Sequence, residues 1–393
     1  MSAARPRARP VLHFVGAMRV AIVHYWLLKM RGGEKVVEAL CRLFPAADIF
    51  TLFYNPEQVS KVITSRKVTA SFLSPFRRSY RSLLPLMPLA LEHFDLRGYD
   101  LVISSESGPA KGVLVPSTAR HICYCHSPMR YLWELYPEYL HSWTRNRLKR
   151  AIIAPVANYL RLWDYASAAR VDTFVANSRN VMQRIWRAYR REAYVVHPPV
   201  ATGTFYWHQP EDYFLAVSEL VPYKRIDAAV RVFSKTGRRL RIAGTGPEYR
   251  SLRRIAGPNI EFCGWVPEDQ LRDLYSKSRA LVFPGEEDFG LAPVEAMASG
   301  KPVVALRRGG ILESVLEPGG GVLYSAPEDE HLAGALTDFE RIESEIEPEA
   351  LQRHASQFSE AEFRRRISPF LGLGVPQKTS DLADGSPMLP AGQ

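Results

Sequence analysis

The strongest constraint on the fold is a run of short apolar segments alternating with amphipathic ones, and the run occurs twice. A buried strand is expected at 19–25, and further strands follow it up to residue 176. After a Pro-containing stretch at 195–199 the alternation starts again with a strand at 213–217. Short apolar strands separated by helices are typical of doubly wound parallel sheets, which helices cover on both faces. The sequence therefore predicts an α/β chain with two such domains.

Apolar runs and capping residues predict the individual elements. Helices are expected at 32–44 and at 178–189, the second with Ser178 as its N-cap. Ligands of such sheets lie beyond the carboxyl ends of the strands, so functional residues are expected just after strands. The other predicted strands are 48–53, 101–104, 121–125 and 173–176 in the first half, and 240–243, 260–263, 281–283 and 303–306 in the second.

The two runs divide the chain into four parts. We expect a disordered extension at 1–17, an N-terminal Rossmann-like domain at 18–200, a C-terminal Rossmann-like domain at 201–370 and a disordered tail at 371–393. The extension alternates Arg with Ala and Pro, which favours disorder. Met18 directly precedes the first strand, and we hypothesise that it is the natural start. A signal peptide is disfavoured, because Arg19 interrupts the apolar stretch at 11–28 that follows the basic start.

Charge is distributed unevenly along the chain. The chain has 51 Lys and Arg residues and 41 Asp and Glu residues, of which residues 1–200 hold 29 and 13. The net charge is therefore +16 in residues 1–200 and −6 in the remainder. A basic half indicates an anionic partner, or only a solvated basic surface. Nucleic acid is not expected, because no motif that reads it is present. The four cysteines have no regular spacing and predict neither a disulfide scaffold nor a zinc site, which fits a cytoplasmic protein.

Two glycine-containing turns follow predicted strands. Gly32 and Gly33 open the first helix, and Gly244 and Gly246 follow the second strand of the second half. Glycines at such turns allow a ligand to approach the backbone, and a helix N-terminus favours negative charge. A turn that only requires a positive φ is the alternative. The second turn is not a dinucleotide fingerprint, because Tyr249 stands at the third glycine position.

The most specific segment is the acidic loop after the strand at 281–283. Glu287 lies in this loop, and Glu295 lies on the first turns of the helix that follows. Carboxylates accept hydrogen bonds from pairs of sugar hydroxyls, and backbone amides at 289–291 are suited to phosphate. The segment therefore predicts one edge of a site for a phosphorylated sugar, with solvated acids at a helix start as the alternative.

Together these motifs resemble the E-x7-E signature of retaining glycosyltransferases of GT-B architecture, family 4. The resemblance extends from Met18 to about Phe370, and the segment 124–133 is similar to a bacterial branch containing mannosyltransferases of surface-polysaccharide assembly. It implies two Rossmann-like domains that face a central cleft, with the acceptor on the first and the nucleotide sugar on the second. Further landmarks are the segments 175–178, 197–200, 221–227, 244–247 and 264–266.

The resemblance also implies a role for each site residue. His126 would face the donor sugar near the reacting carbon, with a buried, hydrogen-bonded structural histidine as the alternative. Lys224 would neutralise the departing diphosphate, and Glu287 would bind hydroxyls of the transferred sugar. Glu295 would hold the ribose hydroxyls. The remaining donor-binding residues are Gly32, Gly33, Arg225, Gly244, Gly246, Trp265, Val266, Asp288, Phe289, Gly290 and Leu291, of which Trp265 and Val266 would flank the base.

The implied reaction is retaining transfer of a hexose to a lipid-linked or polysaccharide acceptor, without a metal or other cofactor. The sequence has no Asp-x-Asp motif or histidine cluster suited to a metal, so a lysine and helix N-termini are expected to stabilise the leaving group. GDP-mannose is the expected donor. The alternatives are a UDP sugar as donor, a sugar-nucleotide epimerase of the same shape, and a non-catalytic basic module that binds membranes.

One position departs from the family pattern. Many relatives have an arginine shortly before the lysine, and here Glu219 occupies that position. A carboxylate there repels a diphosphate unless it points away. Arg225, or Arg31 from the other domain, is expected to supply the missing positive charge.

Two stretches of the first half combine cations with apolar side chains. Residues 71–91 hold Arg77, Arg78 and Arg81 beside several leucines. Such segments favour an anionic membrane surface, at about 1 kcal/mol for each basic residue. We expect peripheral attachment to the inner leaflet, where a lipid-linked acceptor is presented; core helices with a basic outer face are the alternative. The second stretch, 143–163, holds Arg145, Arg147, Lys149 and Arg150.

Overall fold

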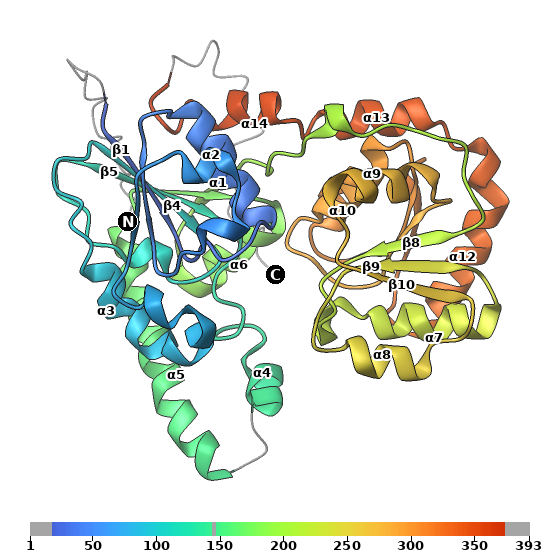
Figure 1. Cartoon of the computed structure of the whole chain (residues 1–393), viewed down its shortest axis with the longest axis horizontal. Coiled ribbons are helices and arrows are strands. Elements are labelled where there is room, and N and C mark those ends of the chain that lie inside the picture. The colour runs from blue at the N-terminus through green and yellow to red at the C-terminus, as the bar shows by residue number, and fades with distance from the viewer. Residues whose placement is uncertain (1–17, 144–146, 374–393) are drawn as a thin grey trace, which may run out of the picture. The chain divides into compact units, whose positions relative to one another are not determined.

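The computed structural model describes residues 18–143 and 147–373, which form two parallel β-sheets flanked by helices (Figure 1). The first sheet has the strand order β3-β2-β1-β4-β5-β6-β7, and the second has the order β10-β9-β8-β11-β12-β13. The predicted α/β class with two doubly wound sheets is therefore confirmed. No helix in the described part of the chain has the length and apolar composition needed to cross a membrane.

In the first sheet the chain order reverses between β1 and β4, because β1 pairs in parallel with β2 on one side and β4 on the other. The strands are β1 (Val20–His24), β2 (Asp48–Thr51), β3 (Val68–Ala70), β4 (Leu101–Glu106), β5 (Arg120–Cys125), β6 (Thr173–Ala176) and β7 (Ala193–Val195). The helical segments are α1 (Gly32–Leu43), η1 (Pro56–Gln58), α2 (Lys61–Thr64), η2 (Ser74–Leu86), α3 (Met87–Glu92), η3 (Ala110–Gly112), α4 (Tyr136–Trp143), α5 (Arg147–Ser167), η4 (Ala168–Arg170), α6 (Arg179–Tyr189) and η5 (Thr202–Thr204).

The second sheet repeats this reversal between β8 and β11, which are neighbours. Its strands are β8 (Phe214–Val217), β9 (Leu240–Ala243), β10 (Ile260–Gly264), β11 (Leu281–Phe283), β12 (Val303–Leu306) and β13 (Gly321–Tyr324). The helical segments are η6 (Pro222–Lys224), α7 (Ile226–Thr236), α8 (Tyr249–Ile255), α9 (Glu268–Lys277), α10 (Leu291–Ala298), α11 (Ile311–Ser314), α12 (Asp329–Ile342), η7 (Glu343–Glu345), α13 (Pro348–Ser356) and α14 (Glu360–Ile367).

Both faces of the second sheet are buried. Along β11, Leu281 and Phe283 belong to one apolar cluster and Val282 to the other, because successive side chains of a strand point to opposite faces. Helices α7 and α12 pack on the face of Val282, and α10 and α13 pack on the opposite face (Figure 1). This two-sided burial explains why the strands are continuously apolar.

Contacts group the described residues into two compact units. Of the described residues, the first holds 18–125, 129–143, 147–174 and 365–373, and the second holds 126–128 and 175–364. Residues 175–200 are thus grouped with the second unit, while the predicted boundary after residue 200 stays a prediction. The extension at 1–17 and the tail from 374 onward lie outside the described residues, whereas Leu371, at the start of the predicted tail, is buried.

Candidate functional site

Two loops at the switch point of the second sheet bring Lys224 and Glu287 together. Lys224 ends the segment that follows β8, and Glu287 lies in the loop that follows the neighbouring strand β11. Their side chains form an ion pair and are 14% and 18% exposed. The loops also pack backbone to backbone, since a Cβ on Gly285 would lie 2.7 Å from the Lys224 Cα. The two predicted residues are therefore neighbours, at the edge where ligands of such sheets bind.

Glu295 is buried on α10, where Tyr275 of α9 supports it. The Tyr275 hydroxyl donates a hydrogen bond of 3.0 Å to Glu295 Oε2. Burial, and next the Glu295 charge, raises the pKa of Tyr275 well above its usual value, so this hydroxyl stays a donor. The sequence analysis missed Tyr275, because a tyrosine on an amphipathic helix has no signal that separates it from an ordinary core residue.

Gly244 and Gly246 pack against the loop that precedes Lys224. A Cβ on Gly244, whose φ is +146°, would lie 1.8 Å from the Ser218 carbonyl oxygen, and a Cβ on Gly246 would lie 2.3 Å from that of Leu220. Both glycines are therefore required by packing between loops, whatever their role toward a ligand.

Arg225 begins α7 with a left-handed backbone, φ 53°. Its guanidinium donates a 2.6 Å hydrogen bond to the carbonyl of Pro327. This contact gives Arg225 a structural partner within its own unit. Glu219, at the position of the missing arginine, is half-buried.

Arg184 of α6 forms two ion pairs with the acidic loop after β11. Its guanidinium pairs with Glu286 at 2.9 Å and with Asp288, and Ser178 Oγ donates to the Asp288 carbonyl at 2.5 Å. The Asp288 carboxylate, predicted to bind the donor, is thus already in an ion pair. Sequence reasoning did not identify Arg184, because a separation of about 100 residues leaves no periodic signal.

The N-terminus of α6 is fixed by a carboxylate from a different part of the unit. Glu313 accepts hydrogen bonds from the backbone amides of Arg179 at 2.8 Å and Asn180 at 3.2 Å, and His197 Nε2 lies 3.2 Å from it. Ser178 caps the same helix by accepting a hydrogen bond from the Val181 amide at 3.1 Å, which confirms the predicted N-cap.

The residues that open α10 divide between core and turn. Phe289 is buried and stacks on His197 with centroids 5.1 Å apart, and Leu291 packs on the same cluster. Gly290 is the N-cap with φ 92°. Only the backbone amides of this stretch, and not its side chains, therefore remain suited to meet a phosphate.

The other predicted residues occupy different surroundings. Trp265 follows β10 and is 75% exposed, while Val266 packs partly on the core. In the first unit Gly32 and Gly33 open α1, as predicted. His126 follows β5 directly and is half-buried.

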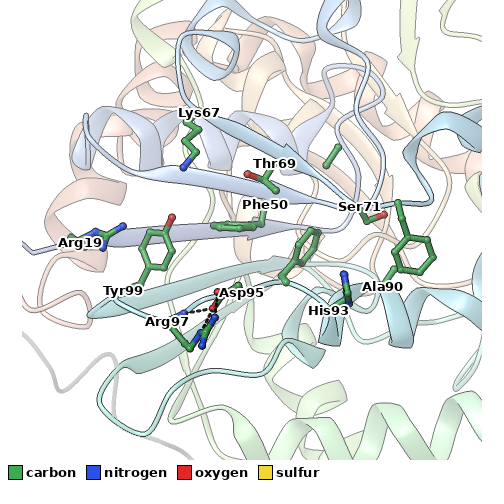
Figure 2. A pocket seen from close by; sticks show the side chains of 13 residues that line it. Arg19, Phe50, Lys67, Thr69, Ser71, Ala90, His93, Asp95, Arg97 and Tyr99 are labelled. Atoms are coloured by element: carbon green, nitrogen blue, oxygen red, sulfur yellow. Dashed lines mark hydrogen bonds and ion pairs between the residues drawn. The ribbon is translucent and has the colours of Figure 1, made fainter.

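A hollow of about 410 Å³ lies in the first unit, over β2, β3 and the residues after α3 (Figure 2). Phe50 and Tyr99 meet edge to face in it, with centroids 5.7 Å apart. Arg97 at its rim is paired with Asp95 at 2.6 Å, so this positive charge is already compensated. The predicted site residues are not part of its lining.

Two family descriptions match consecutive parts of the chain. Residues 30–203 match Glycosyltransferase Family 4, and residues 207–358 match Glycosyl transferases group 1. HepE of Anabaena in complex with UDP and glucose has a similar fold, with a TM-score of 0.66 at 16% identity over 91% of this chain and 100% of HepE.

Two curated relatives share shorter regions. The O-antigen chain mannosyltransferase RfbU of Salmonella typhimurium is 30% identical over 39% of this chain and 44% of its own length. The GDP-mannose-dependent alpha-(1-6)-phosphatidylinositol monomannoside mannosyltransferase of Mycolicibacterium smegmatis is 28% identical over 32% of this chain and 37% of its own length. The chain thus spans less than half the length of these relatives.

Proposed function

Because the chain belongs to the family 4 glycosyltransferases of GT-B fold, we propose that it transfers a hexose from a nucleotide sugar to an acceptor, with retention. The observation that carries the proposal is the Lys224–Glu287 ion pair at the switch point of the second sheet. A cation and a carboxylate at this edge match the two parts of a nucleotide sugar, its diphosphate and its sugar hydroxyls.

In the proposed mechanism the donor exchanges partners with this pair. The diphosphate takes the Lys224 ammonium, and the sugar hydroxyls take the Glu287 carboxylate, so the charges that now neutralise each other bind the substrate. Lys224 and the amides that open α10 then stabilise the negative charge of the departing diphosphate without a metal. Glu295 holds the ribose hydroxyls, Trp265 and Val266 flank the base, and retention follows a front-side route in which the leaving phosphate takes the acceptor proton.

We propose GDP-mannose as the donor. Two relatives named as mannosyltransferases support this choice, and one of them is named as GDP-mannose-dependent. The UDP and glucose bound by HepE keep a UDP sugar as the second candidate. Both donors carry the diphosphate and ribose that the Lys224 and Glu295 assignments address, and they differ in base and sugar.

The test is thermal stabilisation by GDP, UDP, ADP and their sugars in the presence of EDTA. A ligand at about 100 times its Kd stabilises a folded protein by ~2.7 kcal/mol. A shift with GDP and GDP-mannose alone supports the proposed donor, and a shift with UDP compounds alone overturns it. Glu295→Gln should remove most of the shift. The control is Glu340→Gln on α12, which alters a carboxylate paired with Arg238 and should leave the shift unchanged. No shift with any nucleotide contradicts the proposed function.

For the acceptor we propose a lipid-linked or polysaccharide molecule reached from an anionic membrane surface. Large apolar side chains are exposed beside Arg77, Arg78 and Arg81, as expected for an interfacial segment. Met87, which lies within the same stretch 71–91, is instead buried in the core. Of the second stretch, Arg145 and the side chains of Arg147 and Lys149 lie outside the described residues. The exposed apolar side chains are Phe72, Phe76, Leu86 and Leu89 near η2 and α3, with Ile152, Tyr159, Leu162 and Tyr165 on α5.

Flotation with liposomes tests this surface. The protein should float with anionic liposomes at low salt and stay at the bottom with neutral ones, because its basic residues need an anionic surface. Replacing Phe76 and Leu89 by serine should reduce flotation, while the same change at exposed Leu312 in the second unit should not. A wild-type protein that stays at the bottom with anionic liposomes overturns the proposal.

A further inference from the structure

Three charged side chains form a fully buried ionic triad at the carboxyl end of the first sheet. Glu106 is the last residue of β4, Lys111 lies in η3, and Asp164 lies on α5. Lys111 Nζ is 3.1 Å from Glu106 Oε1 and forms a second ion pair with Asp164, and all three side chains are 0% exposed. The Lys111 amide also donates to Glu106 Oε2 at 2.6 Å.

Stability alone does not explain such a group. Taking charges out of water costs several kcal/mol for each ion, and well-packed apolar residues are often as stable or more so. Burial, which the Lys111 charge only partly offsets, raises the pKa of the Glu106 carboxyl to about 7. Buried ionic groups are better attested as devices that fix one arrangement of the chain. The question is therefore which segment this triad fixes.

The residues of the triad contact the chain on either side of the segment 126–133, by backbone strand pairing at one end and by a side-chain hydrogen bond at the other. At one end, Cys125 is the register partner of Glu106 in the β4–β5 pair, and His126 follows Cys125 directly. At the other end, the Trp133 indole Nε1 donates a hydrogen bond of 2.7 Å to Asp164 Oδ2. Lys111 joins the two anchors, because it binds both carboxylates.

Between these anchors the segment also packs on α5. Met129 and Leu132 are buried against Ala157 and Leu160 of this helix. Arg161 Nη1 donates to the Leu132 carbonyl at 3.2 Å. The segment therefore depends on the placement of α5, which Asp164 connects to the sheet through Lys111.

We infer that Lys111, through Glu106, Asp164 and Trp133, is a positioning residue for His126. This inference rests on the proposed function, in which His126 faces the reacting carbon. Lys111 touches no substrate in this account. It keeps the strand end before His126 and the helix beyond it at a fixed separation, so that the imidazole is held in one place when the donor binds.

The experiment removes one hydrogen bond, and a control with the same change of side chain accounts for the lost packing. Trp133→Phe deletes the indole donor to Asp164 together with part of the ring, and the matched control is the same change at Trp163 of α5, whose indole donates to Glu92 Oε1 at 3.0 Å. Trp133→Phe should lower kcat about tenfold and leave the donor KM within about twofold, because positioning acts in the transition state. Trp163→Phe should leave kcat within about twofold of the wild type.

A double-mutant cycle with His126→Ala identifies the route. If Trp133 acts through His126, Trp133→Phe has no further effect on kcat once the imidazole is gone. An unchanged kcat in Trp133→Phe, or a tenfold effect that persists in the His126→Ala background, overturns the inference.

Hydrogen exchange separates this inference from the proposed function. Trp133→Phe should speed amide exchange in 126–133, and Trp163→Phe should not. A wild-type protein without transferase activity contradicts the proposed function, and faster exchange would still support the fixing of this segment. Unchanged exchange in Trp133→Phe overturns the inference even in an active enzyme.

Discussion

The two sheets have the same reversal of strand order, but they place charges at their switch points differently. In the first unit, Glu106, Lys111 and Asp164 are 0% exposed, and the one ammonium pairs with both carboxylates inside the protein. In the second unit, Lys224 and Glu287 form a pair that still reaches the surface. On these proposals, one kind of ion pair serves two purposes. A fully buried pair fixes the chain, whereas a pair near solvent can exchange its partner for a ligand.

The largest expected difference between the two sites comes from the same substitution in each. Lys111→Met leaves two buried carboxylates without their cation and should lower the free energy of unfolding by about 3–5 kcal/mol. Lys224→Met should lower it by less than Lys111→Met does, since that pair keeps some contact with solvent, yet lower turnover at least about tenfold. Urea unfolding and initial rates measure both. Equal losses of stability, or near-normal turnover in Lys224→Met, would break the comparison.

The pH dependence of stability should also come from buried groups of the first sheet. Burial lowers the pKa of His121 to about 4 and raises that of Glu106 to about 7. Between pH 4 and 6.5 the unfolded chain binds the His121 proton, so this group makes stability fall with acid. Between pH 4.5 and 7 the folded chain binds the Glu106 proton, so this group makes stability rise as the pH falls. Each of the two contributions amounts to about 3 kcal/mol.

Single variants separate these opposing contributions. Against the wild type, His121→Gln should gain stability as pH falls from 6.5 to 4.5, and Glu106→Gln should lose it. Urea unfolding at the two pH values measures the slopes. Slopes of the same sign in the two variants would contradict the assignment.

A smaller loss of stability is expected at the buried Glu295 carboxylate of the second unit, because the substitution at Tyr275 removes one hydrogen bond and no charge. Tyr275→Phe removes the hydrogen bond to Glu295 and should lower the free energy of unfolding by about 1.5–3 kcal/mol, as for hydrogen bonds to charged groups. Tyr213→Phe is the control, since its hydroxyl donates to the neutral carbonyl of Leu274 at 2.8 Å and should cost about 0.5–1.5 kcal/mol. A larger loss in the control would show that Glu295 does not depend on Tyr275.

The smallest effect on stability is expected at Trp265, which is mostly exposed. Trp265→Ala should change the free energy of unfolding by less than about 0.5 kcal/mol. It should weaken nucleotide binding by about 1–3 kcal/mol if the indole stacks on the base. Calorimetric titration with the nucleotide that stabilises the protein measures this, with Tyr206→Ala, another exposed aromatic of this unit, as the control. Unchanged affinity would remove Trp265 from the site.

The sequence predicted the parts of the molecule that local chemistry determines. Short apolar runs identified most strands, and the rule that ligands follow strand ends pointed to the loop of Glu287, whereas Lys224 was assigned from the family resemblance. Strands β3, β7 and β13 were missed, because three or four half-buried residues give no clear period.

Long-range partners could not be predicted in the same way. Arg184 meets Asp288 only because folding brings α6 to the loop after β11. Lys111 and Asp164 lie 53 positions apart and read separately as ordinary surface charges. Their pairing is a property of the tertiary structure, and a single sequence contains no periodic trace of it.

The assignment of residues 365–373 to the first compact unit has a practical consequence for dissecting the protein. The first unit is discontinuous in sequence, and Arg120 donates a hydrogen bond to the Phe370 carbonyl within it. A single cut after residue 200 would separate the first fragment from a piece of its own unit. Split versions for fragment complementation, or circular permutants that express one unit alone, must therefore graft 365–373 back onto the N-terminal piece.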